Sequence, residues 1–438
     1  MTTTPQIVSR KVTDLKPAVR NARTHSKAQI KQIADSIEQF GFTNPVLMDA
    51  ADRIIAGHGR VEAAMLLGLK TVPTLRLDHL SDEQVRAYVI ADNKLAENAG
   101  WDEELLALEL QYLDGLDLDF DLTITGFEMA EIDAMLVLDP DTEEEVVPEP
   151  SEGPAVTQAG DLWMIGKHRL YCGDATKPAS YDALFDGSKA AQMIFTDPPY
   201  NVPISGHVCG LGSVQHREFE MAAGEMSTEK FEAFLRSVCD NLAASSINGS
   251  IHYICMDWRH MGEVLRAGDA AYGELKNLCV WSKTNGGMGS LYRSQHELVF
   301  VFKNGTKPHI NNVKLGKHGR YRTNVWEYAG INSFGESRDE ELATHPTVKP
   351  VKLVEDAILD CSKRGGIILD AFAGSGTTLI AAHRAGRVGY GLELDPAYCD
   401  VIIKRMQDET GLKAKLAGSD DKFDERATMP QAREMADA

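Results

Sequence analysis

The 438-residue sequence is poor in cysteine and has no long apolar run. Its seven cysteines all lie between Cys172 and Cys399 and form no Cys-x-x-Cys pair, which argues against a disulfide framework and against a zinc knuckle. No apolar run approaches the roughly 18 to 20 residues that span a bilayer. The N-terminus also lacks the apolar core of a signal peptide. We therefore expect a cytoplasmic protein with no metal site and no membrane partner.

Basic residues are scarce as well, since 45 lysines and arginines stand against 65 acidic residues and give a net charge of −20. This sum argues against a nucleic-acid partner, but binding depends on the local field rather than on the total. Residues 298–326 contain six basic residues and no acid, which fits either a solvated loop or a phosphate-binding surface. The six are Lys303, Lys307, Lys314, Lys317, Arg320 and Arg322.

A chain of this length is expected to form two or three domains. Residues 139–156 hold seven acids, four prolines and no base, so we predict an extended linker there. Residues 96–138 have apolar residues at three- and four-residue spacing and predict a helical extension. These helices could pack together, act as a spacer or mediate dimerisation. Residues 416–438 are predicted to be a polar tail.

Before the linker, the pattern predicts an amphipathic helix with Ser26 as its N-cap and Gly41 at its C-terminal end. The "GHGR" box, which ends at Arg60, opens a second helix whose free amides attract anions. Residues 5–95 resemble the ParB/sulfiredoxin-like N-terminal domain, a small α+β fold. The resemblance implies that the box contacts DNA or nucleotide phosphates. We favour DNA binding or docking over nuclease or nucleotide hydrolysis, and the stretch has no cysteine for a sulfiredoxin-type reaction.

A second glycine-rich turn, "DAFAGSGTT", starts at Asp370 after the apolar run Ile367–Leu369. A helix, a second strand and Glu393, 19 residues after Gly374, complete a βαβ nucleoside-binding pattern. The turn lacks the lysine of a P-loop, and the third residue after Gly376 is leucine rather than the glycine of a dinucleotide fold. The pattern therefore predicts a nucleoside ligand without a pyrophosphate.

The apolar run "AAQMIF" ends in "TDPPYN", residues 196–201, where two prolines stand between a carboxylate and an aromatic ring. Proline fixes φ and lacks an amide donor, so the motif alone predicts a turn at the end of a strand. Together with "DAFAGSGTT" and "THPTVKP" (residues 344–350), it resembles the β group of DNA amino-methyltransferases, in which the catalytic motif comes first. The resemblance covers residues 157–410, and we predict a methyltransferase domain at 157–415.

This resemblance implies an α/β, S-adenosylmethionine-dependent methyltransferase (Rossmann-like) fold with permuted motif order. It implies that Asp197 and the Pro198 carbonyl accept hydrogen bonds from the two N–H groups of an exocyclic amine. Pro199 is expected to stiffen the turn. Tyr200 is expected to stack on a flipped base. Asp174 is expected to contact the adenine of the cofactor. The full set implied for S-adenosylmethionine is Asp174, Thr347, Lys349, Asp370, Phe372, Gly374, Gly376, Thr377 and Glu393.

The segment from about residue 303 to residue 344 is the expected target-recognition segment. The six basic residues from Lys303 to Arg322, together with Arg60 of the N-terminal domain, are predicted to bind duplex DNA. His296 and Glu297, in the strand that precedes this segment, are predicted to be structural.

The resemblance favours site-specific methylation of adenine N6, because in this family serine more often opens the motif of the cytosine N4 enzymes. Methylation of cytosine N4, methylation of RNA or a free nucleotide, and a ParB-like DNA-binding regulator with a degenerate methyltransferase domain remain alternatives. Methylation of cytosine C5 is excluded because the chain has no Pro-Cys pair. A homodimer is expected from β-group relatives, and a partner endonuclease of a restriction-modification system is left open.

Overall fold

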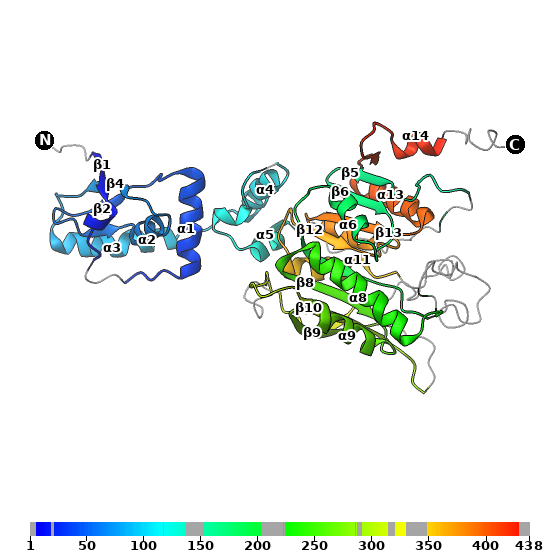
Figure 1. Cartoon of the computed structure of the whole chain (residues 1–438). Helices are drawn as coiled ribbons and strands as arrows, with labels where there is room; N and C mark the ends of the chain where they lie inside the picture. Colours follow the sequence, from blue (N-terminus) through cyan, green and yellow to red (C-terminus); the bar gives the residue numbers. More distant parts are fainter. Residues whose placement is uncertain are drawn as a thin grey trace. The chain divides into compact units, whose positions relative to one another are not determined.

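The computed structural model describes residues 6–18, 22–116, 118–136, 150, 153–202, 222, 224–284, 286, 291–313, 320–329 and 348–428. It divides into two compact units, Met1–Leu136 and Val137–Ala438 (Figure 1). The predicted linker, tail and target-recognition segment lie partly outside the described residues. None of the helices in the described part of the chain is both long and apolar enough to cross a membrane.

The first unit is built on a four-stranded sheet in the order β1-β4-β2-β3, in which β2 and β4 are parallel. Apolar residues of this sheet, among them Val46, Met48 and Val72, form its core together with residues of α2. The strands of the sheet and the helices between and after them are, in chain order, β1 (Ile7–Lys11), η1 (Val12–Asp14), α1 (Lys27–Phe40), β2 (Val46–Met48), β3 (Ile54–Ala56), α2 (His58–Leu66), β4 (Thr71–Arg76) and α3 (Asp82–Glu97).

Local capping accounts for the ends of the first two helices. The predicted ends of α1 are confirmed, because Ser26 Oγ accepts the Gln29 amide at 3.1 Å and Gly41 follows the helix with a φ of +79°. Gly57 has a φ of +102° as the N-cap of α2, a conformation that favours glycine. The Arg60 side chain folds back over this turn, since a Cβ on Gly57 would lie 3.0 Å from Arg60 Nη2.

The end of the first unit is helical. Its elements are α4 (Glu103–Asp114), η2 (Leu122–Thr125) and α5 (Met129–Leu136). Leu110 of α4 and Ile132 of α5 are buried, and the rings of Trp101 and Phe127 lie 5.6 Å apart. These helices therefore pack together around a small apolar core.

The second unit is built on a ten-stranded sheet with a parallel centre. The strand order is β11-β9-β10-β8-β7-β12-β13-β6-β5-β14, and β8, β7, β12, β13 and β6 run parallel. The α/β fold class is thereby confirmed. The strands are β5 (Leu162–Ile165), β6 (His168–Cys172), β7 (Ala191–Thr196), β8 (Ser246–Met256), β9 (Glu274–Ser282), β10 (His296–Lys303), β11 (Val325–Glu327), β12 (Ile367–Asp370), β13 (Val388–Glu393) and β14 (Lys415–Leu416).

Helices cover both faces of this sheet (Figure 1). Alternate residues of β7 face opposite sides: Ile194 packs with α8 and α9, whereas Met193 and Phe195 pack with α11 and α12. A strand buried on both faces reads as a continuous apolar run, which explains "AAQMIF". The helices are α6 (Pro178–Phe185), α8 (Thr228–Ala244), α9 (Met261–Ala271), α11 (Val351–Cys361), α12 (Thr377–Arg384), α13 (Pro396–Thr410) and α14 (Phe423–Thr428).

Strands β7 and β12 are neighbours in the sheet although they are far apart in sequence, and Ile194 pairs with Leu369. The chain continues from β7 to β8 on one side and from β12 to β13 on the other, so their carboxyl ends form a topological switch point. Ligands of open α/β sheets bind in the crevice at such a point. The Asp-Pro-Pro-Tyr turn follows β7 and the glycine-rich turn follows β12, so the fold brings both motifs to this crevice.

Candidate active site

A cavity of about 200 Å³ lies at the switch point. The turn after β7, the glycine-rich turn after β12 and the ends of β6 and β13 contribute to its lining. Asp197, Pro198, Pro199 and Tyr200 all line it. So do seven of the residues predicted to bind a cofactor, namely Asp174, Lys349, Asp370, Phe372, Gly374, Thr377 and Glu393.

Gly374 leaves the glycine-rich turn open to the cavity. Its φ is +52°, and the nearest atom to a Cβ placed there would be the Phe372 carbonyl oxygen at 3.9 Å. The Gly374 N–H donates to Glu393 Oε2 at 2.8 Å, and the Asp395 N–H donates to Oε1 at 2.9 Å. Burial raises the pKa of Glu393 to about 7. The turn thus combines open space with a fixed carboxyl group that retains lone pairs for ligand hydroxyls.

Two other predicted cofactor residues have different positions. Gly376 begins α12 with a φ of +87°, and a Cβ there would lie 3.0 Å from Ile402 Cγ2. It therefore permits α12 to pack closely against α13. Thr347 lies outside the described residues.

Asp370 connects β12 to β7 and to α12. Its Oδ1 accepts the Thr196 hydroxyl at 2.8 Å and the Phe372 amide at 3.0 Å, and its Oδ2 accepts the Thr378 hydroxyl at 2.6 Å. Burial raises the pKa of Asp370 to about 7, although these hydrogen bonds oppose the rise. Thr196 directly precedes Asp197, so the bond holds the two motifs together. Thr196 and Thr378 lie within the two quoted motifs, but the sequence does not reveal that their hydroxyls meet at Asp370, because the Thr196 contact joins distant segments.

Asp174 lies after β6 on the same cavity. Its Oδ1 accepts the Thr176 amide at 2.8 Å and the Thr176 hydroxyl at 2.7 Å, and Lys177 Nζ lies 4.0 Å from Oδ2. The carboxylate is therefore oriented by a local turn. Its place on the cavity that Gly374 also lines is consistent with the predicted contact to the adenine of the cofactor.

Asp197 belongs to a cluster of charged and polar side chains from four segments. Lys349 Nζ donates to Asp197 Oδ2 at 2.5 Å and to Glu297 Oε2 at 2.9 Å. The Tyr200 hydroxyl donates to Asp197 Oδ1 at 2.7 Å and lies 3.0 Å from Glu297 Oε2. Lys283 forms an ion pair with Glu297 Oε1. We call these five residues the Asp197 cluster.

Burial and charge act against each other in the Asp197 cluster. Burial raises the pKa of Asp197, and the Lys349 charge opposes that rise. Burial would also raise the pKa of Glu297, but the Lys349 and Lys283 charges outweigh it and bring that pKa to about 2. The two carboxylates in turn outweigh the burial of Lys349 and raise its pKa. Burial raises the pKa of Tyr200, so the phenol keeps its proton.

Glu297, which was predicted from the sequence to be structural, contacts a residue of the Asp-Pro-Pro-Tyr turn. It lies near the start of β10 and contacts Tyr200, 97 residues away along the chain. Its place at the head of the apolar run "LVFVF" gives no local signal for its contacts with Tyr200 and Lys349. Through Lys349 and Tyr200, Glu297 therefore lies in the same cluster as Asp197.

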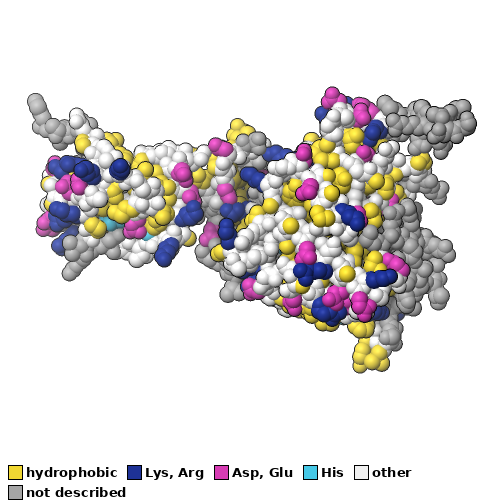
Figure 2. All heavy atoms as spheres, in the orientation of Figure 1, with side chains coloured by type: hydrophobic (Ala, Val, Ile, Leu, Met, Phe, Trp, Pro, Cys, Tyr) yellow, Lys and Arg dark blue, Asp and Glu magenta, His cyan; other side chains and the backbone are white. Residues whose placement is uncertain are grey.

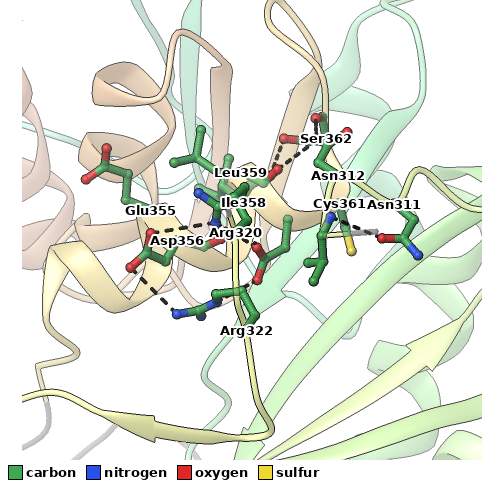
Figure 3. A network of polar contacts seen from close by, with 12 residues as sticks. Asn311, Asn312, Arg320, Arg322, Glu355, Asp356, Ile358, Leu359, Cys361 and Ser362 are labelled. Atoms are coloured by element: carbon green, nitrogen blue, oxygen red, sulfur yellow. Dashed lines mark hydrogen bonds and ion pairs between the residues drawn. The ribbon is translucent and has the colours of Figure 1, made fainter. Parts of the chain in front are cut away.

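Arg320 and Arg322, both predicted to bind DNA, are engaged within the second unit. Figure 3 shows them against α11, where Arg320 Nη2 lies 2.6 Å from Asp360 Oδ1 and Arg322 Nε lies 3.0 Å from Asp360 Oδ2. Arg322 also donates to the Tyr328 hydroxyl at 2.7 Å, and that hydroxyl donates to Asp356 at 2.6 Å. Because buried Asp360 holds both guanidinium groups, a structural role fits them better than the predicted phosphate contact.

The four lysines predicted to bind DNA have different positions. Lys303 is mostly buried and pairs with Glu274 at 3.4 Å, whereas Lys307 is exposed. Lys314 and Lys317 lie outside the described residues. Figure 2 shows basic and acidic side chains interspersed on the face of the second unit that it draws. Of the four lysines, Lys307 is therefore the one that the structure describes at the surface.

The "GHGR" box of the first unit is likewise engaged in internal contacts. Arg60 is partly buried, donates to the Pro45 carbonyl at 3.3 Å and has its pKa lowered by burial. His58 Nε2 accepts the Ala18 amide at 3.1 Å. These contacts hold the loops around the start of α2, where Arg60 was predicted to contact DNA.

The fold and the two motifs that meet at its switch point define an amino-methyltransferase domain. Residues 191–405 match the N6_N4_Mtase family, described as DNA methylase, and residues 2–94 match the ParB N-terminal domain. Residues 104–159 match the ParB-methyltransferase HTH domain, which the sequence analysis had predicted only as a helical extension and a linker. The chain belongs to the N6/N4 DNA methyltransferase family and carries a ParB N-terminal domain. This family uses S-adenosylmethionine as its methyl donor.

Known relatives match the two parts of the chain separately. The ParB-like nuclease domain-containing protein YnaK of Escherichia coli (strain K12) is 53% identical over 79 residues, which are 18% of this chain and 91% of that protein. Type II methyltransferase M2.DpnII of Streptococcus pneumoniae is 30% identical over 236 residues, which cover 50% of this chain and 84% of that protein. The crystal structure of the M1.HpyAVI-SAM complex aligns with a TM-score of 0.40 and 19% identity, covering 54% of this chain and 98% of that chain.

Proposed function

We propose that this chain transfers a methyl group from S-adenosylmethionine to the N6 amine of adenine in duplex DNA. The observation that supports this most directly is the meeting of the Asp-Pro-Pro-Tyr turn and the glycine-rich turn at one cavity. When bound, S-adenosylmethionine supplies a methyl group on a positively charged sulfur. Glu393 would accept its ribose hydroxyls, the open backbone at Gly374 would admit it, and Asp174 would contact its adenine.

The acceptor amine is a poor nucleophile because its lone pair is delocalised into the base ring. Asp197 and the Pro198 carbonyl would each accept a hydrogen bond from one N–H group of the amine. These two hydrogen bonds favour a pyramidal nitrogen with a localised lone pair. This nitrogen forms its bond to the methyl carbon as the bond between that carbon and sulfur breaks. The methylated nitrogen then loses one proton, to Asp197 or to water.

A duplex hides the amine, so the target base must leave the stack before it can reach Asp197. Tyr200 lines the cavity, and its hydroxyl is held by Asp197 at 2.7 Å. This bond fixes the orientation of the ring on which the flipped base would stack.

Adenine is favoured over cytosine because aspartate opens the motif, a position that serine more often occupies in cytosine N4 enzymes. The ParB domain and the helices that follow it would dock the enzyme on DNA, and the cytoplasm is the compartment in which we expect it to act.

Label transfer from methyl-tritiated S-adenosylmethionine tests this function. The full chain is incubated in parallel with duplex DNA of mixed sequence, with RNA and with free nucleotides. Label in duplex DNA supports the proposal, and label in RNA or nucleotides alone would reassign the substrate. A chain that labels none of the three would support the DNA-binding regulator instead.

A further inference from the structure

Lys349 is more deeply buried than the two carboxylates it contacts. Its side chain is 5% exposed, compared with 24% for Asp197 and 14% for Glu297. An ammonium group has three N–H donors. Three acceptors surround this one, because the Tyr200 hydroxyl lies 3.3 Å from Nζ in addition to the two carboxylates. In this arrangement all three donors are engaged, and none remains for S-adenosylmethionine, the ligand that the resemblance implies for Lys349.

Asp197 is held on both of its carboxylate oxygens. Tyr200 donates to Oδ1 and Lys349 donates to Oδ2, so the carboxylate cannot rotate without breaking one of these bonds. Each carboxylate oxygen has about two lone-pair sites, so one site on each oxygen remains. Because Asp197 lines the cavity, these remaining sites are available to an amine that enters it.

We propose that Lys349 and Glu297 are positioning residues of the amine site: Lys349 fixes the Asp197 carboxylate and keeps it charged, and Glu297 holds the Lys349 ammonium in place. This inference rests on the proposed function, in which Asp197 accepts an N–H bond of the target amine. Glu297 is itself held on its other oxygen by Lys283. Neither positioning residue has to touch the substrate.

The charges around Asp197 determine whether its carboxyl group is protonated or ionised. The groups that face Asp197 are Lys349, Glu297, Tyr200, Cys255 and Asp370. Burial raises the pKa of both Tyr200 and Cys255, so these two groups stay neutral. Within this set, Lys349 is the positive charge that opposes burial and the neighbouring acids. Its removal favours protonation of Asp197, whereas removal of the Glu297 charge favours ionisation of Asp197.

The test is the pH dependence of kcat for the full chain, measured for Lys349→Gln and Glu297→Gln. In each profile, kcat falls on the acid side as Asp197 becomes protonated, and we call this fall the acid limb. For Lys349→Gln we expect the acid limb to move to higher pH. Once the limb lies above neutral pH, each further pH unit costs about a tenfold loss of kcat at neutral pH. For Glu297→Gln we expect the acid limb to move to lower pH, with a reduced plateau because the ammonium is less well held. Asp370, whose pKa burial raises to about 7, is present in every variant, so the profiles are compared between variants.

Two further variants control the comparison. Lys352→Gln removes a nearby exposed lysine that pairs with Glu355 at 3.4 Å, and we expect it to leave the pH profile unchanged. Lys349→Arg retains the charge, so its acid limb should stay close to that of the wild type.

Unmoved acid limbs in both Lys349→Gln and Glu297→Gln would overturn the inference, even if both variants were slow. A raised KM for S-adenosylmethionine in Lys349→Gln, with an unmoved acid limb, would return Lys349 to the cofactor and overturn it as well. If Lys349→Gln does not fold, Glu297→Gln decides: an acid limb that moves to lower pH supports the inference, and an unmoved one overturns it. A wild-type chain that methylates no nucleic acid would instead contradict the proposed function, which separates the two failures.

Discussion

Replacing Arg322 by methionine tests whether the arginine–aspartate network in Figure 3 is structural. The guanidinium lies 3.0 Å from Asp360 Oδ2, donates to Tyr328 at 2.7 Å and stands 5.2 Å from the centre of the Trp326 ring. Hydrogen bonds that involve a charged group contribute about 1.5–3 kcal/mol each, so the loss of two of them is expected to lower the free energy of unfolding by about 3 kcal/mol. Arg320 still pairs with Asp360, and methionine keeps an apolar contact with Trp326, which limits the loss.

Urea unfolding of the full chain, followed by tryptophan fluorescence, measures this effect. With a denaturant slope of about 3 kcal/mol per molar, the Arg322→Met midpoint should fall by about 1 M. The salt dependence of DNA binding should stay unchanged, because no phosphate contact is lost. The matched control is Lys307→Gln, at an exposed lysine. Its urea unfolding midpoint should equal that of the wild type. The salt slope of its DNA binding should fall by about 0.9 if Lys307 contacts a phosphate. An unchanged midpoint with a flatter salt slope in Arg322→Met would refute the structural role and restore the predicted DNA contact.

Three further predictions concern the site and its partners. Asp197→Ala should abolish methyl transfer while calorimetry still detects S-adenosylmethionine binding, and undiminished activity would remove Asp197 from the mechanism. Replacing Lys314 and Lys317 together by glutamine should weaken DNA binding and lower the salt slope by up to about 1.8, whereas an unchanged slope would move the DNA surface elsewhere. Burial raises the pKa of Asp370 from 3.8 to about 7, so its contribution to stability is fully present below pH 3.8 and is lost as the pH rises through 7. Thermal melts between pH 4 and 8 should therefore show a flatter profile for Asp370→Asn than for the wild type, and parallel profiles would contradict this assignment.

Helix ends and the two motifs of the switch point could be predicted because their signals are local. Ser26 and Gly41 act within one turn of the helix they end, and Asp370 directly follows the apolar run of its strand. The strand order could not be obtained from such signals. It was the resemblance to a family with permuted motifs that predicted the meeting of two turns so far apart in sequence.

The charged contacts could not be predicted because they join distant segments. Lys349 meets Asp197 across 152 residues, and Arg322 meets Asp360 across 38. Composition alone indicated an acid-free basic segment around Arg322, yet the acids of α11 pair with it in space. The charge of a segment therefore gives a poor prediction of its partner when a later helix packs against it.

The identity of the methylated base decides whether the Asp197 turn acts on adenine N6 in duplex DNA. Amplified bacterial DNA, which carries no methylation, can be incubated with the full chain and S-adenosylmethionine, digested to nucleosides and analysed by mass spectrometry. We predict N6-methyladenine with the wild type and none with Asp197→Ala. N4-methylcytosine in its place, or no methylated nucleoside with the wild type, would contradict the proposed activity.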